Sequence, residues 1–224
     1  MNQESYRRYQ WLASFAIACF IVNLALCLLP YNRSVYKQTA KQLDAADKQE
    51  GAESSMEVSG AEAALYFEQL ADDFCSYFKS EYDVAGYTLS QANVDALNHI
   101  KRYYRWAWLY VCFAVGLGIY AFRILWIRRE TRPLVFGSIG AVVWLLLRGA
   151  KILWSKKQIY VALRAMILRR DYSFFVAGDL MSAILPGDYA RMMALLYVAI
   201  VCGLIVICLG IRCLIRYLGK PHRF

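Results

Sequence analysis

The chain has 224 residues, of which 59% are hydrophobic and only 19% are charged. Soluble globular proteins are about 45–50% apolar and about 25% charged, so this composition excludes an ordinary soluble domain and predicts an integral membrane protein. The net charge of +9 comes from basic residues at the ends of apolar runs, a pattern typical of membrane-flanking segments rather than of a nucleic-acid-binding surface.

The first predicted elements are a cytoplasmic N-terminus at 1–10 and a membrane span at 11–30. A bilayer core about 30 Å thick needs about 20 apolar residues in a helix, and this run reaches that length. The run is longer than the apolar part of a signal peptide, and no small-x-small cleavage site closes it. We therefore interpret it as an anchor that is retained in the protein.

Residues 31–104 are predicted to form an extracytoplasmic helical domain, partly disordered over the polar stretch 32–60. From Ala61 onward, apolar residues recur at steps of three and four, the pattern of one face of an amphipathic helix. This face comprises Leu65, Tyr66, Leu70, Phe74, Tyr77 and Phe78. Ser90 is a candidate cap for a second helix that continues into a second span at 105–127.

The rest of the chain alternates between short connections and two further spans. The predicted elements are a cytoplasmic loop at 128–133, a third span at 134–154, a second extracytoplasmic loop at 155–191, a fourth span at 192–214 and a cytoplasmic C-terminus at 215–224. Lys and Arg residues in the short flanks place both termini on the cytoplasmic side. The sequence thus predicts an all-α fold with four transmembrane helices and a helical domain between the first two.

His99 is the first candidate for chemistry, because it precedes the second span by about two helical turns. Asp95 and Tyr103 lie four residues to either side, so all three share one face of a helix. An aspartate within reach would hold one ring nitrogen and raise the basicity of the other, as in general bases. The alternative is an ordinary interfacial histidine among the aromatic residues that cluster where helices enter lipid.

Two cations, Arg148 and Lys151, lie inside the third predicted span. A cation at the centre of a span costs about 2.5–3.5 kcal/mol and usually faces a partner or a wet cavity. The planar fork of Arg148 suits a lipid phosphate or an ester oxygen. The alternative is that both side chains extend to the interface and have no other role.

Neither the cysteines nor the known catalytic motifs indicate a metal or a cofactor. Six of the seven cysteines lie in apolar segments, where cysteine acts as a small hydrophobe, and no C-x-x-C occurs. The sequence contains no H-E-x-x-H, G-x-S-x-G or Walker loop. We expect no cofactor and no metal site.

Two stretches resemble a family of bacterial four-span membrane proteins that includes the lipoprotein intramolecular transacylases. The first is LSQANVDALNHIKRYYR at 89–105, in which His99 stands where the family has a histidine just before its second span. The second is FFVAGDLMSAILPGDYAR at 174–191, in which Asp179 and Pro186 match an aspartate and a proline before the last span.

The resemblance implies a location in the bacterial cell membrane, contact with membrane lipids and diacylated lipoproteins as substrates. The implied reaction moves an acyl chain from the glyceryl ester of the lipidated N-terminal cysteine to the α-amine of that cysteine. His99 would be the general base, Asp95 or Asp179 would orient it, and Arg148 or Lys151 would stabilise the oxyanion.

The chain departs from the family at two places. Arg102 stands where the family has an aspartate three residues after the histidine, and no second histidine occurs in 160–168, where active members carry one. One alternative is therefore a non-catalytic membrane protein whose acidic outer domain binds a surface partner. A transporter subunit is disfavoured, because no Gly/Pro-broken span or inverted repeat is visible.

Overall fold

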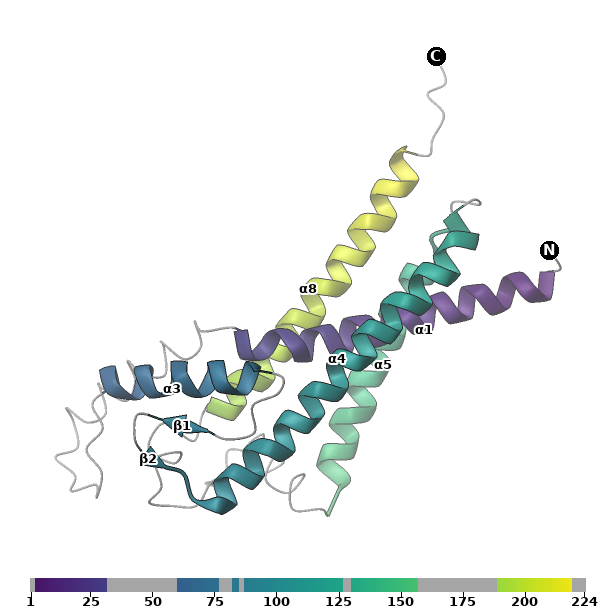
Figure 1. Cartoon of the computed structure of the whole chain (residues 1–224). Coiled ribbons are helices and arrows are strands. Elements are labelled where there is room, and N and C mark those ends of the chain that lie inside the picture. The colour runs from purple at the N-terminus through teal and green to yellow at the C-terminus, as the bar shows by residue number, and fades with distance from the viewer. Residues whose placement is uncertain are drawn as a thin grey trace. The chain divides into compact units, whose positions relative to one another are not determined.

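The computed structural model describes residues 3–31, 60–76, 82–84, 87–126, 130–156 and 189–218 (Figure 1). Its elements are α1 (Gln3–Leu28), the 3₁₀ turn η1 (Leu29–Tyr31), α3 (Gly60–Cys75), β1 (Asp83–Val84), β2 (Tyr87–Thr88), α4 (Gln91–Trp126), α5 (Arg132–Trp154) and α8 (Tyr189–Leu218). The described chain is therefore predominantly helical, as the sequence predicts.

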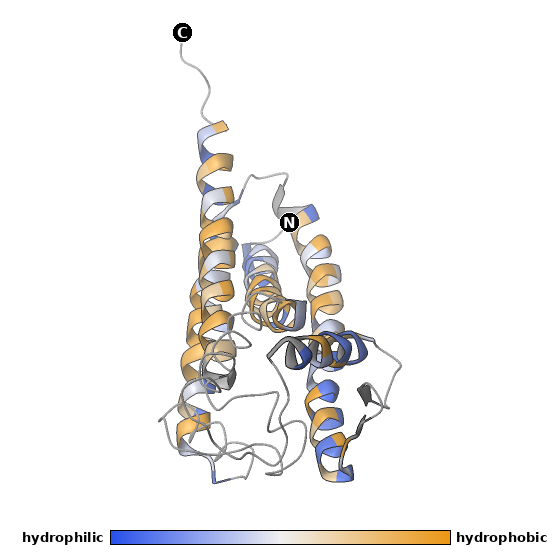
Figure 2. Cartoon of the chain, turned by 90° about the vertical axis from the view of Figure 1, so that its left-hand side faces the viewer, coloured by the Kyte–Doolittle hydropathy of each residue, from blue (hydrophilic) through white to orange (hydrophobic). Residues whose placement is uncertain are grey.

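Four of these helices are long and apolar enough to cross a membrane, which confirms the predicted number of spans. The qualifying stretches are Gln3–Tyr31, Gln91–Arg123, Arg132–Trp154 and Met192–Leu218. Figure 2 shows that apolar residues cover α8, the helix leading to the C-terminus, along nearly its whole length. All four helices begin before the predicted spans, α1 at Gln3, α4 at Gln91, α5 at Arg132 and α8 at Tyr189. Pro133 lies in the first turn of α5, where proline is tolerated.

The described residues fall into two compact units. The first comprises the described parts of Met1–Cys27, Trp106–Lys151 and Tyr197–Phe224, and the second comprises those of Leu28–Arg105 and Ile152–Leu196. The long helices α4 and α8 and the end of α5 contribute residues to both units.

In the first unit, α1 is in contact with each of the other three long helices. Ala13 and Ala121 are fully buried where α1 meets α4. The hydroxyl of Tyr197 on α8 donates a 3.2 Å hydrogen bond to the carbonyl of Val22 on α1. The Cys19 thiol on α1 donates a second bond of this kind, 3.9 Å long, to the carbonyl of Tyr110 on α4. Small side chains and backbone-directed hydrogen bonds hold α1 in place, as is usual for helix packing in lipid.

Helices α1 and α5 approach each other closely in this unit, and a glycine permits it. A Cβ atom at Gly137 would lie 2.6 Å from the Cβ of Ile17 and 2.9 Å from the carbonyl oxygen of Ser14. At Gly140 it would lie 3.2 Å from the Cβ of Ala18. The backbones of α1 and α5 can approach this closely only because Gly137 has no side chain.

Replacing Gly137 by alanine is therefore expected to lower the melting temperature of the detergent-solubilised protein. The added methyl forces α1 and α5 apart, and overpacking of this kind costs about 1–3 kcal/mol. Gly149→Ala on the same helix is the matched control, because nothing lies within 4 Å of its Cβ position. An equal decrease in both variants would contradict the assigned contact.

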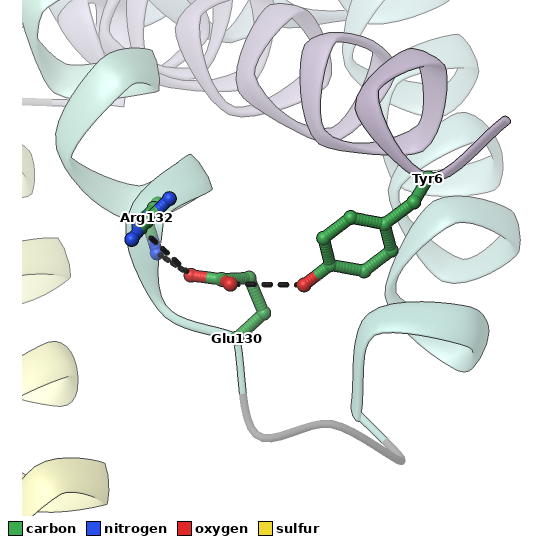
Figure 3. Close-up of polar contacts among 3 residues, drawn as sticks. All are labelled: Tyr6, Glu130 and Arg132. Atoms are coloured by element: carbon green, nitrogen blue, oxygen red, sulfur yellow. Dashed lines mark hydrogen bonds and ion pairs between the residues drawn. The ribbon is translucent and has the colours of Figure 1, made fainter. Parts of the chain in front are cut away.

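The start of α1 is tied to the connection before α5 through Glu130 (Figure 3). One carboxylate oxygen of Glu130 accepts a 2.9 Å hydrogen bond from the Tyr6 hydroxyl. The other oxygen accepts a 3.1 Å hydrogen bond from the backbone N–H of Arg132 and lies 3.8 Å from the Arg132 Nε. Glu130 thus supplies a negative charge and an acceptor at the N-terminus of α5, where both are stabilising.

Glu130→Ala is expected to destabilise the protein by about 1–2 kcal/mol, because a helix cap and a link between two helices are lost together. Glu4→Ala provides the comparison. It removes the 2.8 Å ion pair between Glu4, which is 71% exposed, and Arg8, which is 76% exposed. Ion pairs as exposed as this contribute little to stability. Thermal unfolding in detergent measures both variants, and a larger loss from Glu4→Ala would refute the role given to Glu130.

The second unit contains a feature that the sequence did not predict. Strands β1 and β2 form an antiparallel pair in which Asp83 lies opposite Thr88 and Val84 opposite Tyr87. The fold remains all-α in class, with this one short strand pair added. Two-residue strands are too short to show the alternation from which a strand is recognised in a sequence.

The helices of this unit begin as predicted. Helix α3 covers the predicted amphipathic stretch as far as Cys75. Leu70 on the predicted apolar face is buried, whereas Leu65, which was assigned to the same face, is 54% exposed. Tyr77 and Phe78 lie outside the described residues. The carbonyl of Ser90 accepts hydrogen bonds from the N–H groups of Asn93 and Val94, so α4 starts where a cap was expected and continues into the second span.

Candidate functional site

The candidate site is centred on His99 in the first part of α4. The His99 ring is half-buried and meets the ring of Tyr103 edge-on, with 5.2 Å between the centroids and 81° between the ring planes. The two residues are four apart, which brings their side chains together on one helix face. Tyr103 is 57% exposed, so this face of α4 remains open beside the imidazole.

The opposite face of α4 is closed. Asn93, Leu97, Lys101 and Tyr104 recur at helical spacing, and each is no more than 5% exposed. Because successive residues turn about 100°, Lys101 points about 200° away from His99. The second unit therefore packs against one side of α4 and leaves the histidine on the other.

Lys101 forms the link to α3. It is 1% exposed, and its Nζ donates a 2.7 Å hydrogen bond to the backbone carbonyl of Asp73 in the last turn of α3. A cation is favourable at a helix C-terminus, where unpaired carbonyls carry partial negative charge. The same Nζ lies 5.5 Å from the centre of the Tyr82 ring, a distance suited to a cation–π contact.

Tyr82 connects this link to the residue next to His99. Burial raises the pKa of Tyr82 to about 12, with a further increase from Asp73 and an opposing effect from Arg105. The hydroxyl is therefore protonated at neutral pH, and it donates a 3.3 Å hydrogen bond to the Oδ1 of Asn98. Tyr82, Asn98 and Lys101 together fix the segment of α4 that carries the imidazole.

The sequence reasoning missed Lys101 and Tyr82. Neither residue belongs to a motif or to the predicted face of His99. The available signal was the four-residue spacing of Asn93, Leu97 and Lys101, which places the lysine on the buried stripe. A lysine on such a stripe is usually read as solvated, because lysine is almost never fully buried without a partner.

Asp95 lies one turn before His99 on the same helix and is exposed. Its carboxylate accepts a 3.1 Å hydrogen bond from the side-chain amide of Gln91. Among the residues that the structure describes, no hydrogen bond joins Asp95 to His99. The orienting role of Asp95 therefore remains a prediction.

The described structure does not test whether the other two predicted site residues lie near His99. Arg148 belongs to the first unit, whereas His99 and Asp95 belong to the second. Asp179, with the rest of 157–188, lies outside the described residues. The roles of Arg148 and Asp179 in a shared site are thus not tested by this geometry.

Metal ligands do not gather in the part of the chain that the structure describes, where no group of three or more His, Cys, Asp or Glu side chains could hold an ion. All seven cysteines are present as free thiols. The chemistry available around His99 is that of an imidazole with neighbouring carboxylate, phenol and amide groups.

Solved structures of one protein have the same fold as this chain. They are structures of the membrane integral lipoprotein intramolecular transacylase Lit from Bacillus cereus. A form with a histidine-to-arginine mutation has a TM-score of 0.77 and 13% identity over 97% of this chain and 96% of that one. Another has a TM-score of 0.75 and 15% identity over 96% and 98% of the two chains. A histidine-to-alanine form has a TM-score of 0.76 and 16% identity over 98% of this chain and 96% of that one.

At 13–16% identity these matches establish the fold and leave the activity open. No family model and no curated protein sequence matches this chain. The similarity confirms the resemblance at the level of the fold, and this similarity covers nearly the whole chain.

Proposed function

We propose that this protein, whose fold is that of the membrane integral lipoprotein intramolecular transacylase, catalyses the same class of reaction. The substrate would be a lipoprotein whose N-terminal cysteine carries a diacylglyceryl group. The observation that carries the proposal is the position of His99 on the exposed face of the first part of α4, six residues before residue 105, where the sequence predicts the second span to begin.

The proposed step exchanges an ester for an amide within one molecule. The α-amine of the cysteine attacks the ester carbonyl, a C–N bond forms, and the C–O bond to the glyceryl oxygen breaks. His99 takes the proton from the amine and returns it to the leaving oxygen, so protons balance without a cofactor. Asp95 or Asp179 would hold the imidazole in the required orientation.

The position of His99 along α4 supports access to such a substrate. Seven residues separate His99 from Trp106, which corresponds to about 10 Å along the helix axis. Trp106 and Tyr110 are about half exposed, with ring centroids 6.3 Å apart, and exposed aromatic residues of this kind favour the membrane interface. His99 would then lie near the depth of lipid ester groups.

The orientation that we propose places both termini in the cytoplasm and the segment between α1 and α4 outside. Basic residues support this arrangement, with Arg123 in the last turn of α4 and Arg216 in the last turn of α8. The lipid-linked end of an exported lipoprotein would then lie on the same side as His99.

The direct test incubates the purified protein with a synthetic diacylated lipopeptide. Substrate and product have the same mass, so the assay follows loss of the free α-amine and the fragment ions that locate the acyl chain by mass spectrometry. The Bacillus cereus enzyme is the positive control. Absence of conversion under conditions in which the control converts its substrate would refute the proposal.

A second candidate function rests on a specific observation. The chain contains only two histidines, and the other, His222, is near the C-terminal end. A protein of this fold that has lost one imidazole could instead bind a partner through its outer segment without catalysis. In that case the lipopeptide would be bound or ignored but never converted.

A further inference from the structure

Arg148 is a cation within the membrane-crossing helix α5, six residues before its end at Trp154. That separation corresponds to about 9 Å along the helix axis. The arginine is exposed, and residues around it are apolar and exposed, including Leu146 at 68% and Leu147 at 61%. The charge therefore lies among side chains suited to lipid.

Trp144, one turn earlier, holds the guanidinium in a defined position. The Arg148 Cζ lies 4.9 Å from the centre of the Trp144 ring, which is a cation–π contact. A guanidinium held by a ring in this way can still donate from its N–H groups to an oxyanion. A guanidinium fork matches the geometry of a phosphate or a carboxylate.

The face of α5 that carries Arg148 is buried in the first half of the helix and exposed from Trp144 onward. Gly137 and Ala141 are buried and belong to the part of α5 that packs in the core of the first unit. Trp144 continues the same face at helical spacing, yet it is 46% exposed, and Arg148 follows it. A face left open to hydrocarbon would be expected to carry aliphatic residues, whereas this one carries an aromatic ring and a cation.

The charge of Arg148 is not balanced within the described protein. Among the residues that the structure describes, no carboxylate forms an ion pair with it. A cation in a span is costly, and a cation–π contact offsets only part of that cost, so an anion from outside the chain would stabilise this end of α5.

We propose that Arg148 and Trp144 bind the phosphate group of an anionic phospholipid. The guanidinium fork donates to phosphate oxygens, and the acyl chains lie against the exposed apolar residues of α5. Lipid phosphate is the anion that a membrane supplies at this depth, and a helix end rich in Lys and Arg attracts anionic lipid. The ligand differs from the proposed acyl-transfer substrate, because the diacylglyceryl group of that substrate carries no phosphate.

The test counts bound lipids by native mass spectrometry on the full-length protein in detergent. The wild-type protein is titrated with phosphatidylglycerol and with phosphatidylcholine. We expect a preference for phosphatidylglycerol that falls about tenfold in Arg148→Gln, as for loss of one charge-assisted hydrogen-bonded pair. Arg216→Gln, an exposed cation on α8, should keep the preference.

Further outcomes decide the nature of the site. Trp144→Leu keeps the charge but removes the aromatic ring under the guanidinium, and this variant should lose part of the preference for phosphatidylglycerol. Arg148→Lys should lose most of it, because a point charge replaces the fork. An unchanged Arg148→Gln variant, or an equal loss in Arg216→Gln, would overturn the proposal. Competition by inorganic phosphate alone would show that the lipid is not required and would also overturn it.

Discussion

His99→Ala is expected to abolish conversion of the diacylated lipopeptide, with a loss of at least about 100-fold in rate. A positioned general base contributes about 10²- to 10⁴-fold, and no other imidazole occurs in the described residues. The expected loss is in the rate constant for acyl transfer, because the ring acts on the proton that leaves the amine. Single-turnover assays with the variant and the wild-type protein measure it.

The two histidines of the chain provide a matched pair for this experiment. His222→Ala should convert the lipopeptide at the wild-type rate, because that residue is not part of the proposed site. The conversion rate of Asp95→Asn should lie between those of His99→Ala and His222→Ala, since this variant removes only the proposed orienting charge. Full activity in His99→Ala would eliminate the imidazole as the base, even if the protein proved to be a transacylase.

The fold was largely predictable from the sequence because lipid imposes one strong constraint. A helix must supply about 20 apolar residues to cross the bilayer, and every backbone polar group must be paired within it. The runs around Ala16, Ala114, Ala141 and Val201 satisfy this condition, and each lies in a long helix. What composition could not predict was the contact between these helices at Gly137, because a glycine in an apolar run does not indicate which neighbour it touches.

The candidate site was predictable only in part, for two physical reasons. Residues four apart on one helix must share a face, so the pairing of His99 with Tyr103 followed from spacing alone. The contacts of Lys101 with Asp73 and Tyr82 join segments that are distant in sequence, and periodicity carries no information about them. The long-range packing of the second unit therefore had to come from the structure.

The buried position of Lys101 leads to the second large effect. Lys101→Ala is expected to destabilise the second unit by about 3 kcal/mol, because it removes a long buried side chain and leaves the Asp73 carbonyl without this donor. Lys101→Met retains most of the volume but loses the donor and the charge, so its cost should be about 1–2 kcal/mol. The difference in destabilisation between the two variants separates the contribution of side-chain packing from that of the polar contacts of Lys101.

The neighbouring cation Arg102 is the control, since it is exposed on the same helix. Arg102→Ala should change stability by less than about 0.5 kcal/mol, as for ordinary surface substitutions. Hydrogen exchange of the α3 amides is the sharpest measurement, because the Lys101 contact is made to the last turn of that helix. Faster exchange in α3 with unchanged exchange in the membrane-spanning part of α4 is the expected result. If Lys101→Ala and Arg102→Ala behaved alike, the lysine would not be holding α3 to the helix that carries His99.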